Sequence, residues 1–230
     1  MGAGTSRWAV VFDLDGVLVD SYEAHRWSWE RLAAETGVRF TDAEFVASFG
    51  QTSREVIARH WHAPVGSPRN RELDERKEAL YRERLRASFP VVDGARELID
   101  ALRAHGVPLA VGSSAPPENV ALSLELLGRR DAFAVVVTGS DVERGKPDPA
   151  IYLACAARLG VPPPRCVVVE DAPVGVAAAR AAGMRCVALE GTTTAAALHD
   201  ADLVVTSLRE LSPERLAGLV GNDAGRQSPV

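Results

Sequence analysis

Hydrophobic and polar residues alternate along this chain in the way that is typical of a parallel sheet covered by helices. Short and almost purely apolar runs predict buried strands at 8–12, 108–112, 133–138, 166–169, 185–189 and 203–205. Between and after these runs, helical patterns predict helices at 93–105, 117–127, 146–159 and 172–182. Asp93 is the expected N-cap of the first of these helices. This alternation predicts the α/β class, with a Rossmann-like parallel sheet at its core.

One long segment breaks the alternation. Helical patterns at 22–36, 42–49, 53–62 and 72–88 follow one another without an apolar run of strand length. An all-helical insert of about seventy residues between two strand-rich parts indicates a second domain. We therefore predict a core domain formed by 1–21 and 93–230, and an inserted all-helical domain at 22–92. The polar end, 221–230, is expected to be flexible.

Composition narrows the class of protein. With 47% hydrophobic and 25% charged residues, the chain has the balance of a soluble globular protein. A net charge of -5 gives no reason to expect nucleic acid as a partner. Neither a transmembrane run nor a signal peptide is present, so we expect no membrane association and a cytoplasmic location. Cys155, Cys166 and Cys186 lie in apolar segments and are expected to be buried free thiols. We expect a monomer.

Three of the apolar runs are closed by acidic or hydroxyl residues. The set comprises Asp13, Asp15, Ser113, Ser114, Glu170 and Asp171, and Lys146 joins it from the start of a helix. Because the carboxyl ends of parallel strands lie at one edge of a sheet, these residues can meet in space. Each alone has an ordinary explanation as a turn, N-cap or helix-start residue. Their joint occurrence favours a site.

Lys146 stands out in a second way. Only two of the 26 basic residues are lysines, Lys77 and Lys146. Compositional bias toward arginine explains this as well as a specific need for a compact ammonium group does.

The residue types in this set suit phosphoryl transfer. That reaction needs a nucleophile, positive charge around the phosphoryl oxygens, and a proton for the leaving oxygen. Asp13, Glu170 and Asp171 offer the hard oxygen ligands that Mg²⁺ prefers. Lys146 adds a fixed positive charge, and Ser113 can donate a hydrogen bond to a phosphoryl oxygen. The sequence therefore predicts a phosphoryl-transfer site that uses Mg²⁺.

The apolar run that ends in Asp-Leu-Asp-Gly at 13–16 resembles the first motif of the haloacid dehalogenase (HAD) superfamily. The other residues match the remaining motifs in the family's order, over nearly the whole chain. The resemblance implies that Asp13 is the nucleophile and a metal ligand, and that Asp15 is the general acid and base with its carbonyl on the metal. It implies phosphate-binding or metal-binding roles for Ser113, Ser114, Lys146, Glu170 and Asp171.

The pair Glu170-Asp171 resembles the β-phosphoglucomutase-like branch of that family. Many other relatives carry Gly-Asp there, with a further Asp four residues after the pair, where this chain has Gly175. The helical insert is similar to the family's mobile cap. Within it, His25, Arg54 and Lys77 match a hinge-side histidine and substrate-facing cations, although the loop before Arg54 is one residue longer.

We therefore predict a phosphatase of small phosphorylated metabolites, in particular sugar phosphates, that works through an aspartyl-phosphate intermediate. A phosphomutase of the β-phosphoglucomutase type is the main alternative, and an inactive binding module is a further one. A carbon–halogen hydrolase would need neither Asp15 nor a metal. In the mutase, the second phosphate site uses a Ser-Lys pair where this chain has Ala115 and Pro116, which favours the phosphatase. The match of His25 to the branch that contains the mutases argues in the other direction.

Overall fold

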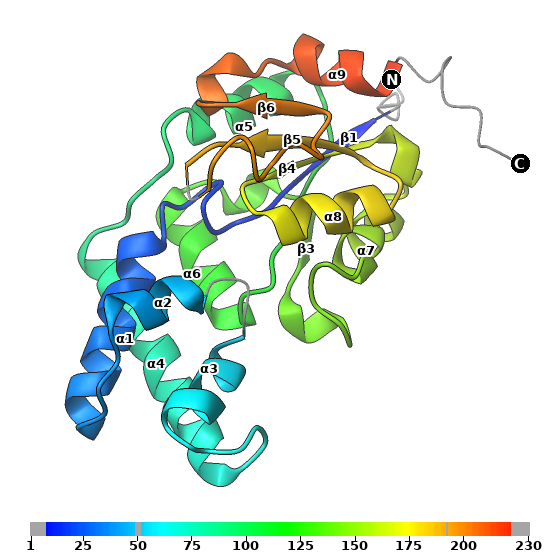
Figure 1. The fold of residues 1–230 in the computed structure, drawn as a ribbon. Coiled ribbons are helices and arrows are strands. Elements are labelled where there is room, and N and C mark those ends of the chain that lie inside the picture. The colour runs from blue at the N-terminus through cyan, green and yellow to red at the C-terminus, as the bar shows by residue number, and fades with distance from the viewer. Residues whose placement is uncertain (1–7, 49–51, 192, 222–230) are drawn as a thin grey trace, which may run out of the picture. The chain divides into compact units, whose positions relative to one another are not determined.

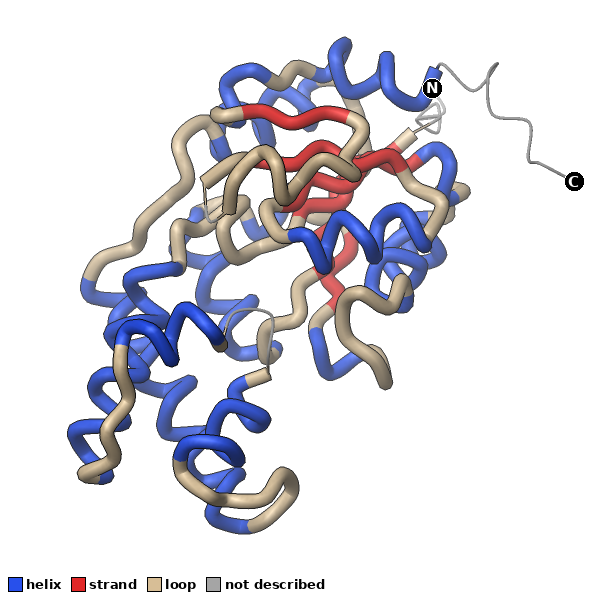
Figure 2. The backbone as a smooth tube through the Cα atoms, viewed as in Figure 1, coloured by secondary structure: helices blue, strands red, loops and turns tan. Residues whose placement is uncertain are grey.

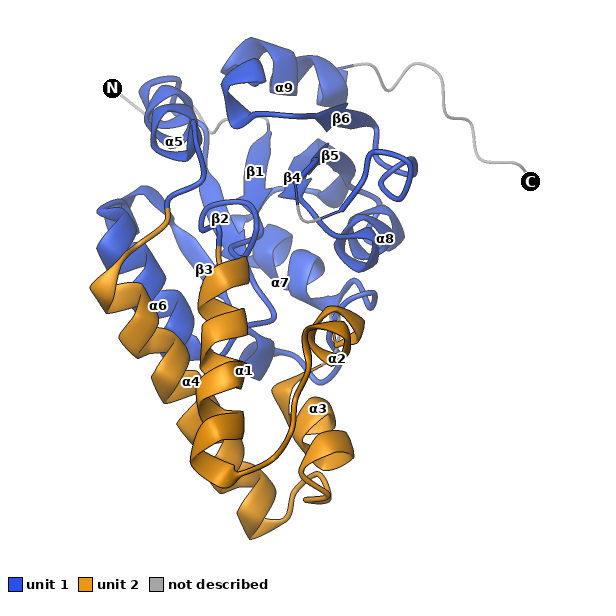
Figure 3. Cartoon of the chain, turned by 60° about the vertical axis from the view of Figure 1, so that its left-hand side comes forward, with its two compact units in different colours: residues 1–20, 91–230 blue, residues 21–90 orange. Residues whose placement is uncertain are grey.

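The computed structural model describes residues 8–48, 52–191 and 193–221. The chain divides into two compact units, shown in Figure 3. We call residues 1–20 and 91–230 the core unit, and residues 21–90 the helical unit. Apart from residue 221, the expected flexible tail lies outside the described residues.

The core unit is built on a six-stranded parallel sheet, seen as the red segments in Figure 2. Its order is β3-β2-β1-β4-β5-β6. The strands are β1 Ala9–Phe12, β2 Leu109–Gly112, β3 Val135–Val137, β4 Cys166–Glu170, β5 Arg185–Leu189 and β6 Leu203–Val205. All neighbouring strands are parallel. The predicted α/β fold with a Rossmann-like sheet is confirmed.

Apolar side chains on both faces explain why these short runs form strands. All four residues of β1 are fully buried, since helices cover both faces of the sheet. Ala9 and Val11 point into a core cluster shared with α7, Ala150–Leu159, and α8, Pro173–Ala181. The other face is covered by α5, Ala95–Ala104, α6, Pro117–Leu127, and α9, Pro213–Gly221 (Figure 1).

Four α-helices form the described part of the helical unit. They are α1 Tyr22–Thr36, α2 Asp42–Ala47, α3 Ser53–His60 and α4 Pro68–Ala87. An apolar cluster holds them together, with Trp29, Leu32, Phe45, Ile57 and Leu80 among its buried members. The sequence starts α2 and α3 locally, because a threonine and the glutamate three residues later form a capping box at each.

The chain leaves the sheet for the helical unit and returns to it at nearly the same point. Val19 and Val91 form an isolated antiparallel bridge. Next to it, the N–H of Val92 donates to the carbonyl of Leu18 at 3.2 Å. The two ends of the insert are thus joined by backbone hydrogen bonding within the core unit.

Three details of the predicted helices were wrong. Helix α7 begins at Ala150 rather than residue 146, and 146–149 form turns and a bend before it. Asp93 does not cap α5: the N-cap is Gly94, and no side-chain hydrogen bond is made there. Both carboxylate oxygens of Asp93 instead accept hydrogen bonds from Arg209 at 2.7 Å. The last insert helix begins at Pro68 rather than residue 72, because Ser67 caps it and proline fits a first turn. The predicted extension of α2 to Phe49 lies outside the described residues.

Two expectations drawn from composition can be compared with the structure. Cys155, Cys166 and Cys186 are free and buried, as predicted. Within 8–48, 52–191 and 193–221, no helix is both long enough and apolar enough to cross a membrane.

Candidate active site

Asp13 lies where the order of the sheet reverses. From β1, the chain builds β2 and β3 on one side of the sheet and β4, β5 and β6 on the other. Asp13 directly follows β1, and its N–H donates to the carbonyl of Val169 in β4 at 2.9 Å. Open α/β sheets bind ligands at such a switch point, beyond the carboxyl ends of the strands. The nucleophile that the sequence predicts therefore has the position expected of a catalytic group.

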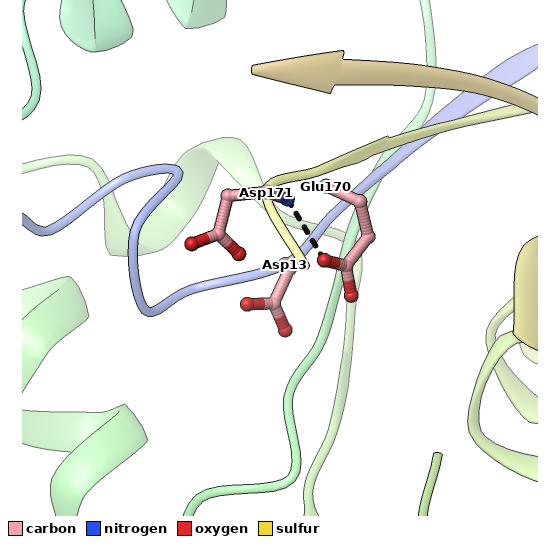
Figure 4. Close-up of side chains that lie close together, drawn as sticks. All are labelled: Asp13, Glu170 and Asp171. Carbon is pink, nitrogen blue, oxygen red and sulfur yellow. Dashed lines mark hydrogen bonds between the residues drawn. The ribbon is translucent and has the colours of Figure 1, made fainter. Parts of the chain in front are cut away.

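Three carboxylates gather at this point. Asp13, Glu170 and Asp171 each offer an oxygen within 4.8 Å of the others, and all three side chains are buried. Figure 4 shows the carboxylate of Asp13 between those of Asp171 and Glu170. Buried like charges repel one another unless a cation balances them. Oxygen donors of this kind and at this spacing fit Mg²⁺.

Lys146 supplies part of the balancing charge. Its Nζ lies 2.6 Å from Oδ1 of Asp13 and 2.7 Å from Oε1 of Glu170. Burial lowers the pKa of Lys146, but the two carboxylates outweigh it and hold the pKa above its ordinary value. Lys146 is therefore fully charged. Lysine is much rarer than arginine in this chain, and one of the two lysines lies at this site. This supports the explanation that a compact ammonium group is specifically needed here.

One lysine does not neutralise the whole cluster. Burial is the main reason that the pKa of Asp13 is raised to about 7. Glu170 and Asp15 add to this effect, and Lys146 opposes it. Asp13 is thus held in a surplus of negative charge, which a bound divalent cation would relieve.

Glu170 accepts four hydrogen bonds, two at each carboxylate oxygen. Its Oε1 accepts from Lys146 and from the hydroxyl of Tyr152, the latter at 2.7 Å. Its Oε2 accepts from the backbone N–H groups of Asp171 at 2.8 Å and Ala172 at 3.0 Å. Burial would raise the pKa of Glu170, yet these donors, Lys146 foremost, keep it below its ordinary value.

Two glycines make room for these carboxylates. A Cβ at Gly175 would lie 1.7 Å from Oε1 of Glu170, so no other residue fits beside that side chain. A Cβ at Gly16 would lie 1.9 Å from Oδ2 of Asp171, and the φ of +78° at Gly16 also favours glycine. Gly175 was already noticeable in the sequence, because many relatives carry an acidic residue at that position. Glu170 fills that space instead.

Asp15 follows Asp13 on a tight turn and is half-buried. The turn is closed by hydrogen bonds from the N–H of Gly16 to Val19 and from that of Val19 to Leu14, at 2.7 and 3.0 Å. These bonds fix the backbone around Asp15, and place it two residues beyond the predicted nucleophile.

Ser113 lies at the same edge of the sheet, directly after β2. It is 1% exposed, its N–H donates to Val137 at 3.0 Å, and its Oγ accepts from the N–H of Ala115 at 3.1 Å. A hydroxyl that accepts a hydrogen bond still has its own proton to donate. Ser114, the next residue, is exposed, and its carbonyl is closely approached by Gly139.

The predicted residues of the helical unit form separate groups. Lys77 is 2% exposed, and its Nζ lies 2.9 Å from Oε1 of Glu78 and 3.0 Å from Nδ1 of His25. The same Nζ lies 5.2 Å from the ring centre of Trp29 and 5.5 Å from that of Tyr81. The positive charge of Lys77 is thus paired with groups of the helical unit itself.

Arg54, by contrast, is on the surface of its unit. Its side chain is 63% exposed, and Nε donates to Oδ2 of Asp74 at 2.9 Å. Arg54 is therefore the one of the three predicted residues that both carries a fixed charge and presents it to solvent.

Tyr152 was missed by the sequence reasoning. It lies on α7, a predicted helix, and its residue type is common in a protein core. The sequence did contain one indication: Tyr152 carries a hydroxyl in an otherwise apolar helical segment that begins shortly after Lys146. That signal does not name the partner, which is 18 residues further along the chain.

The haloacid dehalogenase-like hydrolase family model matches residues 9–183 of this sequence. The chain belongs to this family. The validoxylamine A 7'-phosphate phosphatase of Streptomyces hygroscopicus subsp. limoneus is 36% identical over 204 residues, which are 87% of this chain and 94% of that protein. The fructose-1-phosphate phosphatase of Escherichia coli (strain K12) is 33% identical over 180 residues, 76% of this chain and 92% of that one. Some other relatives are longer, and the matched region makes up 19% or 61% of them.

Solved structures agree with this assignment. A variant of CbbY from Rhodobacter sphaeroides, in complex with xylulose-(1,5)bisphosphate, superposes with a TM-score of 0.82. It is 28% identical in sequence, and the match covers 90% of this chain and 96% of that one. The family predicted from the Asp-Leu-Asp-Gly motif and the residues after the other strands is confirmed.

Proposed function

We propose that this protein is a Mg²⁺-dependent phosphatase of sugar phosphates that forms an aspartyl-phosphate on Asp13. The observation that carries the proposal is the buried contact of Asp13 with Lys146 inside a cluster of three carboxylates, at the switch point of the sheet. The family is one of hydrolases, and relatives named as phosphatases of phosphorylated sugars and related compounds match over most of the chain. Together they identify a phosphoric monoester hydrolase.

The residues present fit a magnesium ion. Asp13 and Asp171, with the backbone carbonyl of Asp15, would hold it directly. Glu170 already accepts four hydrogen bonds, which is about the capacity of a carboxylate, so we expect it to reach the ion through water. When bound, the ion supplies positive charge between the Asp13 carboxylate and the phosphate that it approaches.

Asp13 attacks phosphorus in the first step. Lys146 binds Oδ1, which leaves Oδ2 of Asp13 as the attacking atom. The bond from phosphorus to the sugar oxygen breaks as the bond to Oδ2 forms, and Asp15 gives its proton to the leaving oxygen. Ser113 and Lys146 donate to the phosphoryl oxygens.

Asp15 acts again in the second step. As a carboxylate it takes a proton from water, which attacks phosphorus and releases Asp13 and inorganic phosphate. In the proposal, Arg54 contacts the remote part of the substrate, while His25 and Lys77 support the helical unit that carries it. A cytoplasmic monomer that binds small phosphorylated molecules stays our expectation.

A phosphomutase remains the second candidate, since one structural relative was solved with a bisphosphate. A mutase must hold a second phosphate. The loop after Ser113 offers little for that purpose, because the N–H of Ala115 is used by Ser113 and Pro116 has none. We therefore propose that water is the acceptor.

Release of inorganic phosphate from a panel of sugar monophosphates tests the proposal, with Mg²⁺ and with or without a trace of sugar bisphosphate. We expect phosphate release that the bisphosphate does not stimulate. Conversion of β-glucose 1-phosphate to glucose 6-phosphate without matching phosphate release would identify a mutase. No turnover of any ester, with a folded protein and Mg²⁺ present, would favour a binding module.

A further inference from the structure

Tyr152 is fully buried beside the three carboxylates but belongs to none of the family motifs matched above. It lies in the second position after the start of α7 at Ala150, six residues from Lys146. Its hydroxyl donates to Oε1 of Glu170 at 2.7 Å. The ring lies under Lys146, whose Nζ is 4.8 Å from the ring centre. Tyr152 thus contacts both the ammonium group and one of the carboxylates that hold it.

The hydroxyl is not required by the packing of the core. Ile151, Cys155 and Ala156 on the same helix are buried and apolar, and a phenylalanine would fill the same volume. A buried hydroxyl costs free energy unless it has a partner. Because burial raises the pKa of Tyr152 well above its ordinary value, the phenol stays protonated and acts as a donor. Its donor role toward Glu170 is therefore the specific contribution of the tyrosine.

The hydrogen bond from Tyr152 affects how Lys146 is shared between its ion pairs with Asp13 and Glu170. Lys146 is shared almost equally between Asp13 and Glu170, at 2.6 and 2.7 Å. Tyr152 and Lys146 share the same oxygen of Glu170, so the phenol satisfies part of the charge on that oxygen. Without the phenol, Glu170 would draw Lys146 toward itself and away from Asp13.

Other groups keep Glu170 from moving in response. Its Oε2 is fixed by two backbone N–H groups, and the missing side chain of Gly175 leaves a space that Oε1 fills. Oε1 is therefore held at one place, where Lys146 and Tyr152 both donate to it.

We propose that Tyr152 is a positioning residue, which acts through Glu170 to keep the ammonium group of Lys146 on Asp13. The inference rests on the proposed function, since it concerns the same nucleophile. It assigns Tyr152 no contact with substrate. Its loss should therefore lower the rate of the chemical step and leave substrate binding nearly unchanged.

The variant Tyr152→Phe tests this directly, because it removes only the hydroxyl. We expect kcat to fall about tenfold, as for loss of a group that orients an active-site ligand, with KM within about twofold of wild type. Cys155→Ala is the matched control: it alters a buried residue one turn further along α7, whose thiol donates to the carbonyl of Val111. It should lower the melting temperature without changing kcat.

A double-mutant cycle separates this role from a general effect on folding. If Tyr152 acts through Glu170, adding Tyr152→Phe to Glu170→Gln should change kcat by less than about twofold. Equal losses of kcat in the wild-type and Glu170→Gln backgrounds would overturn the proposal, as would wild-type kcat in Tyr152→Phe alone.

A structural measurement keeps the inference testable without turnover. If no phosphate ester is hydrolysed by the wild-type protein, the proposed function fails, but the arrangement can still be examined. Crystal structures of the wild type and Tyr152→Phe should then differ in the distance from Lys146 to Asp13, which we expect to lengthen in the variant. An unchanged distance would overturn the role of Tyr152.

Discussion

The two lysines of the chain, one in each unit, both have buried side chains that contact acids and aromatic rings, yet their surroundings differ in charge. Lys146 faces Asp13 and Glu170, with Asp171 close by, and the pKa of Asp13 is raised to about 7. Lys77 faces Glu78 and the ring of His25. Burial would raise the pKa of Glu78, but Lys77, followed by His25, lowers it to about 2. The pKa values of Asp13 and Glu78, each beside a lysine, are thus shifted in opposite directions.

The difference lies in the count of negative charges around each lysine. At Lys77, one ammonium meets one carboxylate, which also accepts a hydrogen bond from Ser53 at 2.8 Å. At Lys146, one ammonium meets several carboxylates. The first arrangement stabilises the folded helical unit, whereas the second keeps a charge imbalance that a divalent cation and a phosphate can complete. Of the two lysine–acid pairs in this chain, the one at the proposed site is the one whose surrounding charges do not balance.

The largest expected effect is at Asp13. Asp13→Asn removes the nucleophile and one charge of the surplus, so turnover should fall at least about a thousandfold while the melting temperature of the metal-free protein rises. Steady-state kinetics and thermal unfolding measure the two effects on the same sample. Asp15→Asn is the control, and should slow both chemical steps about a hundredfold or more each. Rapid turnover by Asp13→Asn would mean that the nucleophile is another residue.

Removal of the metal tests whether a divalent cation balances the excess negative charge around Asp13. A chelator should abolish turnover, Mg²⁺ should restore it, and Ca²⁺, which is larger and less strict in geometry, should inhibit. At about 100 times its dissociation constant, Mg²⁺ should stabilise the folded protein by about 2.7 kcal/mol. Calorimetry should show this stabilisation in the wild type and much less in Asp171→Asn. Full activity in excess chelator would contradict the proposed mechanism.

Removal of the carboxylate that pairs with Lys77 should mainly affect the stability of the fold. Glu78→Gln leaves Lys77 buried without its carboxylate, which we expect to cost about 3 kcal/mol of unfolding free energy. Because the folded pKa of Glu78, about 2, lies below its ordinary value of 4.5, its stabilising effect is complete above pH 4.5 and is lost as the pH falls toward 2. Denaturant unfolding at pH 7 and at pH 3 measures this. The variant should lose less stability than the wild type between these two conditions, and an equal loss would show that Glu78 does not titrate as described.

The smallest effect is expected at Arg54. Its ion pair with Asp74 is exposed, so it adds little stability. If Arg54 contacts the remote part of a sugar phosphate, Arg54→Ala should lower kcat/KM for the true substrate about tenfold and leave a nitrophenyl phosphate nearly unaffected. Arg59→Ala, on the same helix, serves as the matched control for loss of an arginine. Equal losses for both esters would point to a defect in the helical unit instead.

Strands and the motifs at their ends were predictable because both depend on short stretches of sequence. The run before Asp13 is apolar on both faces, and acidic or serine residues mark the ends of β1, β2 and β4. Parallel pairing then brings Asp13 and Glu170 together, whereas Lys146 reaches them from the loop before α7. Family resemblance supplied the roles of these residues.

Side-chain partners were less predictable, because they depend on residues distant in sequence. Asp93 has the type and position of an N-cap, but Arg209, 116 residues away, takes both of its oxygens. Tyr152 reads as a core residue until Glu170 is placed beside it. Gly175 looks like a missing ligand until the structure shows that Glu170 occupies its space. In each case a tertiary contact decides what the local pattern leaves open.

The bridge between Val19 and Val91 has a consequence for how the two parts of the chain can vary. With respect to the sheet, residues 20–90 form one closed loop, whose ends are already paired by backbone hydrogen bonds. The entropy of closing such a loop grows only with the logarithm of its length. Insertions, deletions or exchange of the enclosed helices therefore cost the sheet little chain entropy, and the loop can diversify while the strand ends that carry Asp13 and Glu170 stay fixed.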